Sequence, residues 1–475
     1  MLSVMQIVQG VGGRSSPGLE RFPVRGAVVD SRLAGPADLF VAVKGERSDG
    51  HAYVADAFAR GAVAALIERD LEIPGANMVD ARAGAFPRDV GGPPFLIRVD
   101  NTVDALQSAG AAWRAQFSPR MVGVTGSLGK STTKELIAQV LGIRYRTLKN
   151  EGNQNNELGI PMTLLRLRPE HEYAVIEIGM YARGEIARFS SWVRPQIGVI
   201  TMIAPVHLER LGSLDNIAMA KAELVLALPP AAEGGVVVLN DDDARVRGMA
   251  AMTRARVVTA GLTSRADFWI EDIETRGLDG IMVRLREKGI TASYTARVPL
   301  LGAHSANTAL RAAAVGRVAG LSWGEIVEGL GQPGGAIRLQ VIEGPHGSII
   351  IDDTYNASPE STLAALNVLQ EVGDPPRVAV LADMLELADL EEAAHREVGC
   401  RAALVAQLIV CVGERARWIA EEARACGAAP ESVVHVATKS EAIRVVRERV
   451  TQKSTILVKG SRGMEMEDVV AGLQD

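Results

Sequence analysis

The 475-residue chain has few cysteines, few aromatic residues and no long apolar run. Its three cysteines, Cys400, Cys411 and Cys426, lack the paired spacing of a zinc site or a disulfide framework, so we expect buried, reduced thiols. Apolar stretches such as residues 234–239 are far too short to span a bilayer, and no basic segment followed by an apolar one opens the chain. The sequence therefore predicts a cytoplasmic protein without membrane insertion.

An excess of positive charge is also missing. Lys and Arg total 51 against 57 Asp and Glu, which gives a net charge of -6 and excludes a broad basic surface for nucleic acid or anionic lipid. Any phosphate must therefore be bound locally. Hydrophobic residues at 47% and charged residues at 23% place the chain among globular rather than disordered proteins. The length exceeds what one hydrophobic core supports and predicts three domains.

Strand-length apolar runs alternate with helix-length amphipathic stretches, which predicts the α/β class with largely parallel sheets. We place the domains at residues 1–118, 119–332 and 333–475. In the first, strands are predicted at 27–29, 39–43 and 63–67, with a helix at 102–117. In the second, parallel strands are predicted at 121–124, 173–178, 197–203 and 236–239, then a small antiparallel insert at 267–299 and a helix at 305–319. In the third, strands are predicted at 348–351, 378–381, 408–412, 433–436 and 455–458.

Residues 125–132 read Thr-Gly-Ser-Leu-Gly-Lys-Ser-Thr and lie between a predicted strand and a predicted helix. Glycines let the backbone N–H groups face phosphates, Lys130 adds positive charge, and the Ser131 hydroxyl is a ligand for Mg²⁺. The pattern predicts a site for Mg²⁺-ATP, and the alternative is a chance glycine turn with a solvated lysine. The predicted nucleotide contacts in this loop are Gly126, Ser127, Gly129, Lys130, Ser131 and Thr132.

Residues 152–161 read Gly-Asn-Gln-Asn-Asn-Glu-Leu-Gly-Ile-Pro, which is dense in Asn and Gly. Together with the short phosphate loop, this segment resembles the Mur ligases, the ATP-dependent amide-bond enzymes of peptidoglycan precursor synthesis. The resemblance extends to residues 30–32, 38–45 and 49–51 near the start and to 352–359, 383–387 and 459–462 in the third domain. It implies a UDP-sugar-binding first domain, a central ATP-binding domain, and a Rossmann-like third domain that closes on ATP and binds the incoming amine.

The resemblance also implies a metal site. Glu177, His207 and Lys221 match the family's metal-binding glutamate, its metal-ligand histidine and its carbamylated lysine. A carbamate offers the anionic oxygens that Mg²⁺ prefers, whereas a plain ammonium has no lone pair. The alternatives are a solvated carboxylate at a strand end, a histidine in an ordinary core or surface role, and a surface lysine.

Further residues are matched one by one. Asn307, in the segment His-Ser-Ala-Asn, matches an adenine contact, although it is also suited to cap or pack the following helix. Arg338 matches an arginine that approaches the terminal phosphate from the third domain, and Asp353 matches an acidic residue near the ribose. The resemblance places Lys130, His207, Lys221 and Arg338 in catalysis and Ser31, Asn155 and Asn156 at the substrate.

The chain departs from the family pattern at four places. Met202 and Ala204 stand where the family has Asn and Gly, Ile337 precedes Arg338 in place of Gly, and Ser305 replaces the first Asn of His-Asn-x-x-Asn. No matched ligand is lost, but the amide side chain next to the metal site is gone.

The resemblance implies that a substrate carboxylate attacks the ATP γ-phosphate, and that an amine then displaces phosphate from the acyl phosphate. The implied acid is UDP-N-acetylmuramoyl-tripeptide, the implied amine is D-alanyl-D-alanine, and two Mg²⁺ ions and a monomeric state are expected. One alternative is a sister ligase that adds a single amino acid, although the Asp-Asn-Pro-Arg of the diaminopimelate- or lysine-adding type is absent. The others are a folylpolyglutamate-type synthetase and a weakly active sensor of nucleotide-sugar peptides.

Overall fold

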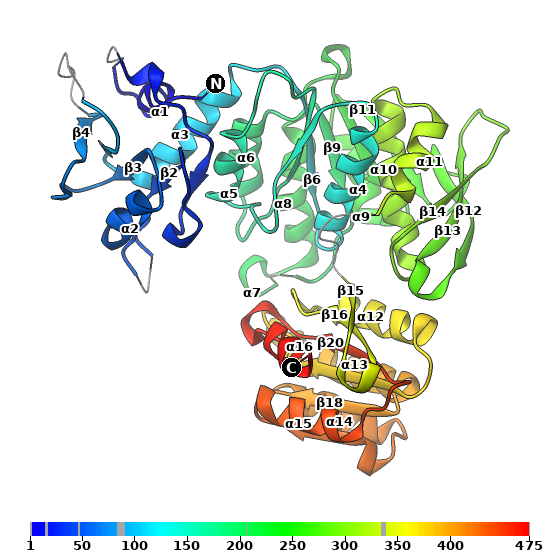
Figure 1. Cartoon of the computed structure of the whole chain (residues 1–475). Coiled ribbons are helices and arrows are strands. Elements are labelled where there is room, and N and C mark those ends of the chain that lie inside the picture. The colour runs from blue at the N-terminus through cyan, green and yellow to red at the C-terminus, as the bar shows by residue number, and fades with distance from the viewer. Residues whose placement is uncertain are drawn as a thin grey trace.

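The computed structural model describes residues 2–14, 18–45, 48–82, 91–206, 208–333 and 339–474. Figure 1 shows three bodies that follow one another along the chain, each built around its own sheet. None of the helices that the structure describes combines the length and apolar character needed to span a bilayer.

The first sheet is entirely parallel, in the order β1-β2-β3-β5-β4. Its strands are β1 (Ala27–Val28), β2 (Leu39–Val41), β3 (Ala64–Ile67), β4 (Asn77–Asp80) and β5 (Phe95–Arg98), and its helices are α1 (Val4–Gly10), α2 (Val54–Ala59) and α3 (Thr102–Arg114). The three predicted strands are present but shorter than predicted, and the sequence pattern misses β4 and β5. Helix α3 joins this body to the central one, because Gly110 lies so close to Pro161 that a Cβ would approach it to 2.8 Å.

The central sheet has nine strands, in the order β14-β13-β12-β11-β10-β9-β6-β8-β7. They are β6 (Arg120–Thr125), β7 (Thr147–Lys149), β8 (Tyr173–Glu177), β9 (Ile197–Ile200), β10 (Val236–Asn240), β11 (Arg256–Gly261), β12 (Phe268–Thr275), β13 (Ile281–Glu287) and β14 (Tyr294–Val298). The predicted antiparallel insert is present as β12 to β14. It continues the main sheet, since β12 pairs in parallel with β11.

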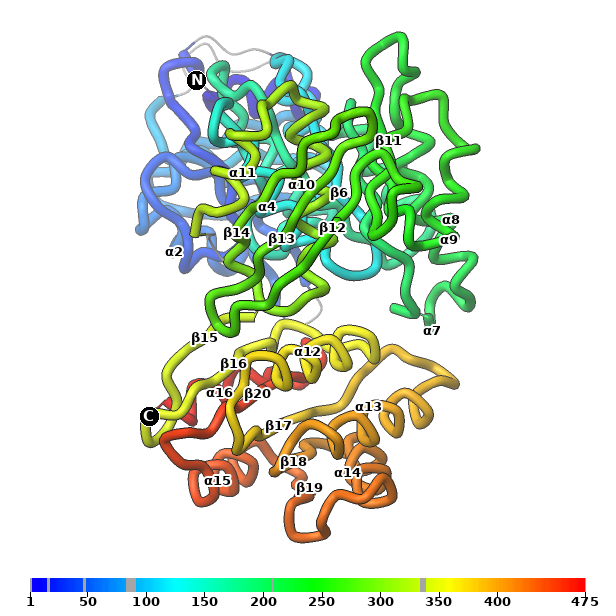
Figure 2. Tube along the Cα trace, turned by 90° about the vertical axis from the view of Figure 1, so that its right-hand side faces the viewer, coloured from blue at the N-terminus to red at the C-terminus, as the bar shows by residue number. Residues whose placement is uncertain are grey.

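Helices cover both faces of the central sheet (Figures 1 and 2). One face carries α4 (Lys130–Gly142), α10 (Ala306–Val318) and α11 (Trp323–Gly331), and the other carries α5 (Gly159–Leu164), α6 (Glu185–Val193) and α8 (Leu214–Leu226). Short helices α7 (Leu208–Leu211) and α9 (Ala244–Gly248) follow β9 and β10. Adjacent residues of β6 therefore enter different cores, Met121 on one side and Val122 on the other.

The third sheet has the order β15-β16-β20-β17-β18-β19 and is parallel except for β15. Its strands are β15 (Gln340–Glu343), β16 (Ile349–Asp353), β17 (Arg377–Ala382), β18 (Leu408–Val412), β19 (Val433–Val436) and β20 (Thr455–Lys459). Helices α12 (Pro359–Val372), α13 (Glu391–Val405) and α14 (Ala416–Ala425) pack on one face, and α15 (Lys439–Arg449) and α16 (Glu467–Gln474) on the other. All five predicted strands are present, and the pattern misses only the edge strand β15.

The prediction of three reduced cysteines is wrong. Cys400 and Cys426 form a disulfide with their Cα atoms 5.3 Å apart, and only Cys411 is a free, buried thiol. The two bonded residues are 26 positions apart in sequence, and they meet because α13 and α14 pack against each other. The spacing of the cysteines in the sequence does not indicate that these two helices pack together.

Candidate functional site

The phosphate loop connects β6 to α4, as the sequence predicts. Gly126 has a φ of 144°, and a Cβ at this position would lie 1.9 Å from the Thr201 Oγ1. Gly129 has a φ of 75° and is the N-cap residue of α4. Both positions need glycine, because an L side chain is strained at these angles and the first position has no room for one.

The loop is held by the segment that follows β9, the strand next to β6. The Ser127 N–H donates to the Met202 carbonyl (2.8 Å) and the Ser127 Oγ to the Ala204 carbonyl (3.0 Å). The Thr201 Oγ1 donates to the Leu128 carbonyl at 2.6 Å. Two of the family departures, Met202 and Ala204, thus support the loop through backbone oxygens, which do not depend on the side chain.

Lys130 opens α4, where backbone N–H groups have no partner within the helix and the dipole favours an anion. Its Nζ donates to the Ser127 carbonyl at 3.0 Å, so the side chain folds back over the loop. Ser131 and Thr132 follow in the first turn, and all three residues are partly exposed. This arrangement suits a phosphate chain.

Glu177 ends β8, next to β6, and is completely buried. Its Oε1 accepts from the Asn155 Nδ2 at 2.8 Å, whereas its Oε2 has no hydrogen-bond partner among the described residues. An unsatisfied, buried carboxylate oxygen is costly, and oxygen of this kind is the ligand that a hard divalent cation prefers. The Glu177 carboxylate therefore fits the predicted metal-binding role.

A residue that the sequence reasoning missed fixes the backbone of Glu177. The Asn150 side chain accepts from the Glu177 N–H (2.9 Å) and donates to the Glu177 carbonyl (3.1 Å). Asn150 is fully buried, and its own carbonyl accepts from the Lys134 Nζ at 2.7 Å. The signal available in the sequence is Asn150 itself, directly before the Asn-rich segment, and its role depends on the β7–β8 pairing.

The predicted substrate residues have partners within the fold. Asn155 orients Glu177, and the Asn156 Oδ1 accepts from the Gly159 N–H (2.9 Å) at the start of α5. Ser31 is buried at the start of a short 3₁₀ helix, and its hydrogen bond to Asp56 lowers the pKa of that carboxyl. Their contact with substrate remains a prediction.

Lys221 lies on α8 and is only 1% exposed. Burial lowers its pKa well below the usual value, and the nearby Lys130 lowers it further, while Glu177 acts in the opposite direction. Because both Lys130 and Glu177 act on Lys221, the three side chains lie near one another in the central body. Desolvation, the largest of these effects, acts against the charged form of the amine.

The third body has its own polar centre, at the carboxyl ends of β16 and β20. Asp353 and Lys459 are register partners on these strands, and the Lys459 Nζ lies 2.5 Å from the Asp353 Oδ2 and 2.7 Å from the Asn356 carbonyl. Lys459 is 2% exposed, so the pair is largely desolvated. Whether Asp353 contacts a ribose is not tested by this pairing and stays a prediction.

The three motifs of the third domain meet at Ser461. Its Oγ donates to the Ala357 carbonyl (3.2 Å) and accepts from the Leu385 N–H (2.9 Å), while its N–H donates to the Asp383 carbonyl (3.1 Å). One residue thus joins the loops after β16, β17 and β20.

His395 was also missed by the sequence reasoning. It is fully buried on α13, its Nε2 accepts from the Met384 N–H (3.0 Å), and its Nδ1 lies 2.6 Å from the Glu391 carbonyl. The Nδ1 is therefore the protonated nitrogen in a neutral ring. Burial lowers the pKa of His395, although the hydrogen bond to Glu391 opposes this shift.

Asn307 lies in the first turn of α10, the helix that packs alongside α4. His207 and Arg338 lie outside the described residues, so their roles remain predictions. No group of three His, Cys, Asp or Glu side chains that could hold a metal occurs in the part of the chain that the structure describes. Mg²⁺ is commonly bound by one or two carboxylates together with water and substrate phosphates, so Glu177 remains a candidate ligand.

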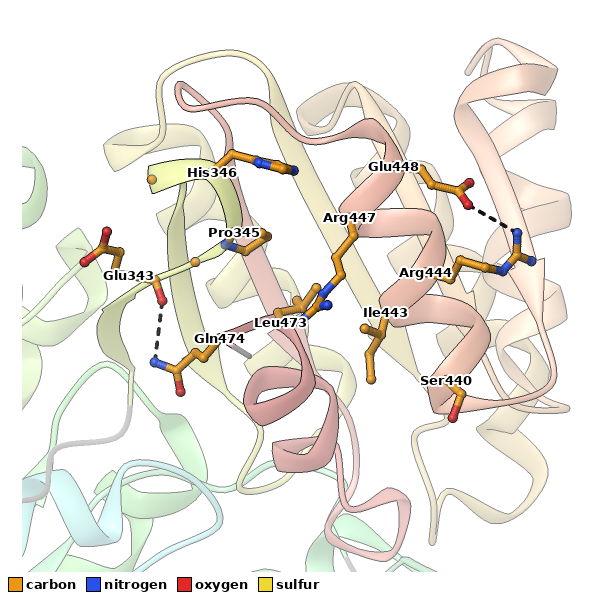
Figure 3. Close-up of a pocket in the computed structure, with 12 residues that line it drawn as sticks. Glu343, Pro345, His346, Ser440, Ile443, Arg444, Arg447, Glu448, Leu473 and Gln474 are labelled. Atoms are coloured by element: carbon orange, nitrogen blue, oxygen red, sulfur yellow. Dashed lines mark hydrogen bonds and ion pairs between the residues drawn. The ribbon is translucent and has the colours of Figure 1, made fainter.

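A cavity of about 820 Å³ opens elsewhere in the third body, between the β15–β16 turn and helices α15 and α16 (Figure 3). Ile443 and Leu473 lie in it, and Arg444 on its rim is paired with Glu448 at 3.5 Å. It lies at the amino end of β16, whereas Asp353 stands at the carboxyl end of that strand. The cavity is therefore separate from the site.

Known proteins share the three-domain fold of this chain. Family models described as "Mur ligase family, catalytic domain", "Mur ligase middle domain" and "Mur ligase, glutamate ligase domain" match residues 23–149, 124–316 and 337–462. The chain is 34% identical to the UDP-N-acetylmuramoyl-tripeptide–D-alanyl-D-alanine ligase of Bacillus subtilis, over 99% of this chain and 98% of that protein. It is 35% identical to the protein of that name in Escherichia coli, over 94% and 93%. The crystal structure of MurF from Acinetobacter baumannii matches with a TM-score of 0.80 and 31% identity, over 100% of this chain and 98% of that one. The chain belongs to the Mur ligase family.

Proposed function

We propose that this protein uses ATP to join D-alanyl-D-alanine to UDP-N-acetylmuramoyl-tripeptide. The relatives that match nearly end to end carry this activity in their names. The proposal depends on three features at one edge of the central sheet. They are the phosphate loop, the buried Glu177 carboxylate with its unpaired Oε2, and the desolvated Lys221.

The reaction follows from bringing two anions together. A carboxylate oxygen of the tripeptide attacks the γ-phosphorus, the bond to the β-phosphate oxygen breaks, and ADP leaves with that electron pair. The loop N–H groups and Lys130 stabilise the negative charge on the phosphates during this step. The amine of D-alanyl-D-alanine then attacks the acyl carbon, the bond from carbon to the phosphate oxygen breaks, and the amine loses a proton as the amide forms.

The side chains present fit Mg²⁺. The open Oε2 of Glu177 and the hydroxyl of Ser131 are oxygen donors of the right kind, and His207 is matched to the same role by resemblance. When bound, Mg²⁺ supplies positive charge between the phosphates and the attacking carboxylate. Two Mg²⁺ ions are proposed to bind.

Lys221 fits the carbamylated lysine of the resemblance. A neutral amine is a nucleophile toward carbon dioxide, whereas an ammonium is not, and burial holds the pKa of Lys221 low. The new N–C bond and the loss of a proton leave a carbamate anion. That anion offsets the positive charge of Lys130 and supplies oxygens to a metal.

The remaining predicted residues belong to the same proposal. Ser31, Asn155 and Asn156 are proposed at the UDP-linked substrate, Asn307 at the adenine, and Arg338 and Asp353 on the third-domain side of the nucleotide. The domains at residues 1–118, 119–332 and 333–475 are proposed to bind UDP-sugar, ATP and the incoming amine. The protein is proposed to act as a monomer.

The test is phosphate release measured over a matrix of UDP-linked peptides and amines, with Lys130→Ala and the exposed Lys288→Ala as a matched control. We expect turnover with the tripeptide and D-alanyl-D-alanine, its loss in Lys130→Ala with UDP-substrate binding retained, and normal turnover in Lys288→Ala. Faster turnover with a single amino acid would reject the specificity. Nucleotide binding without turnover in any pair would indicate a sensor.

A further inference from the structure

A buried arginine lies beside the phosphate loop and has no role in the fold that accounts for its charge. Arg311 is in the second turn of α10 and is 6% exposed. Its Nη2 donates to the Thr308 Oγ1 at 3.4 Å, and its Nε has no hydrogen-bond partner among the described residues. A guanidinium has five N–H donors, and the hydrogen bond to Thr308 is the one that engages them among the described residues.

The guanidinium points toward the start of α4. A Cβ built on Gly129 would lie 4.0 Å from the Arg311 Nη2. Further along the same two helices, a Cβ on Gly316 would lie 2.9 Å from Val140. Helices α4 and α10 therefore run side by side in the same direction, with both N-termini at the edge of the sheet that carries the phosphate loop (Figures 1 and 2).

Positive charge accumulates at this edge. The N-terminus of α4, Lys130 and Arg311 are all positive, and the main opposing charge at Arg311 is Asp242. The Asp242 carboxylate accepts hydrogen bonds from the Leu262 N–H at 3.0 Å. Burial lowers the pKa of Arg311 to about 10, which leaves it charged at neutral pH. Arg311 forms no salt bridge with any of the described residues, and a buried cation without an ion-pair partner is unfavourable unless an anion binds next to it.

We propose that the Arg311 guanidinium binds an oxygen of the α- or β-phosphate of the nucleotide. Asn307 stands four residues earlier, on the same face of α10, and matches an adenine contact. Helix α10 would then contact both the base and the phosphates of the nucleotide, and the phosphate loop would bind the remaining phosphate oxygens. This inference rests on the proposed use of ATP at the loop.

The experiment measures the affinities of ADP, pyrophosphate and adenosine for the full-length wild type, Arg311→Met and Arg311→Lys. Arg317→Met is the matched control, since Arg317 is on the same helix but pairs with Glu287 at 2.9 Å. We expect Arg311→Met to bind ADP and pyrophosphate at least about tenfold more weakly and adenosine within twofold of wild type. Arg311→Lys should lie between, and Arg317→Met should bind all three normally.

Thermal unfolding without ligand separates binding from structure. If Arg311 serves binding, Arg311→Met should leave the thermal unfolding midpoint unchanged or raise it, because the variant removes a buried cation with few partners. If Arg311 is purely structural, the midpoint should fall. Equal ADP affinity in wild type and Arg311→Met overturns the inference, and if that variant does not fold, equal affinity in Arg311→Lys does so. If wild type binds neither ADP nor pyrophosphate, the proposed function fails together with the inference.

Discussion

Gly126→Ala tests whether the phosphate loop depends on its backbone geometry. The added Cβ would lie 1.9 Å from the Thr201 Oγ1 and 3.1 Å from the Met202 nitrogen, at a φ of 144°. Thr201 cannot move freely, since its Oγ1 donates to the Leu128 carbonyl at 2.6 Å. The substitution therefore strains the backbone and also disrupts the hydrogen bond that holds the loop.

The free-energy cost follows from three contributions. A non-glycine residue in this region costs about 1–3 kcal/mol, overpacking about 1–3 kcal/mol, and one lost hydrogen bond about 1 kcal/mol. We expect the free energy of unfolding to fall by about 3–7 kcal/mol, or the loop to shift and lower the cost. A shift of about 1 Å in groups that position phosphates is enough to slow turnover roughly 100-fold.

Urea unfolding and phosphate release are measured on the same preparation. Gly142→Ala is the matched control, because it lies at the end of α4 with no atom within 4 Å of an added Cβ. That change is expected to be neutral or to stabilise by up to about 1 kcal/mol. Thr201→Ala removes the clashing oxygen, so the double variant Gly126→Ala/Thr201→Ala should lose less stability than the two single changes summed. Wild-type stability and turnover in Gly126→Ala would refute the argument.

Four further predictions concern other parts of the site. Asn155→Ala removes the one hydrogen bond that the Glu177 carboxylate accepts among the described residues, so it should cost about 1–3 kcal/mol in unfolding free energy and slow phosphate release. Lys221→Met removes a desolvated amine, so it should abolish phosphate release without lowering the thermal midpoint, and a large drop in the midpoint would contradict this. Lys459→Met breaks a desolvated pair and should cost about 3–5 kcal/mol in urea unfolding, whereas no change would show the pair to be solvated. The folded-state pKa of His395 is depressed, so its contribution to stability is complete above the unfolded value of about 6.5 and is lost as pH falls toward the folded value. This loss should be absent in His395→Gln.

The strands buried on both faces could be predicted from sequence, because they are continuous apolar runs. Leu408–Val412 is buried at every position and matches the predicted bounds. Two of the missed strands, β4 and β15, lack that signal. Residues 340–343 of β15 are mostly exposed, and β4 stands before a glycine- and proline-rich segment, so neither shows a buried run.

The site residues also divide into those that a sequence pattern indicates and those that only the structure reveals. Lys130, Glu177 and Lys221 could be proposed from sequence because each stands in a motif or at a strand end, and the structure places them near one another, while their roles remain predictions. Asn150 and Arg311 could not, because their roles depend on contacts with β8 and α4 that no local pattern records. Asn156 shows that a motif match does not by itself establish a substrate contact. Its side chain accepts a hydrogen bond from the Gly159 N–H at the start of α5 and so also has a structural role.

The two polar centres are organised independently of each other. In the central body, backbone carbonyls hold the phosphate loop, and Asn150 and Asn155 fix Glu177. In the third body, Lys459 and Ser461 fix the loops after β16, β17 and β20 without any contribution from the central sheet. Nucleotide binding is therefore expected to depend mainly on the central centre, whereas turnover needs both. Lys459→Gln should accordingly lower the rate of phosphate release while leaving ADP affinity within about twofold, and a parallel loss of ADP affinity would show that the third body already contributes to the nucleotide site.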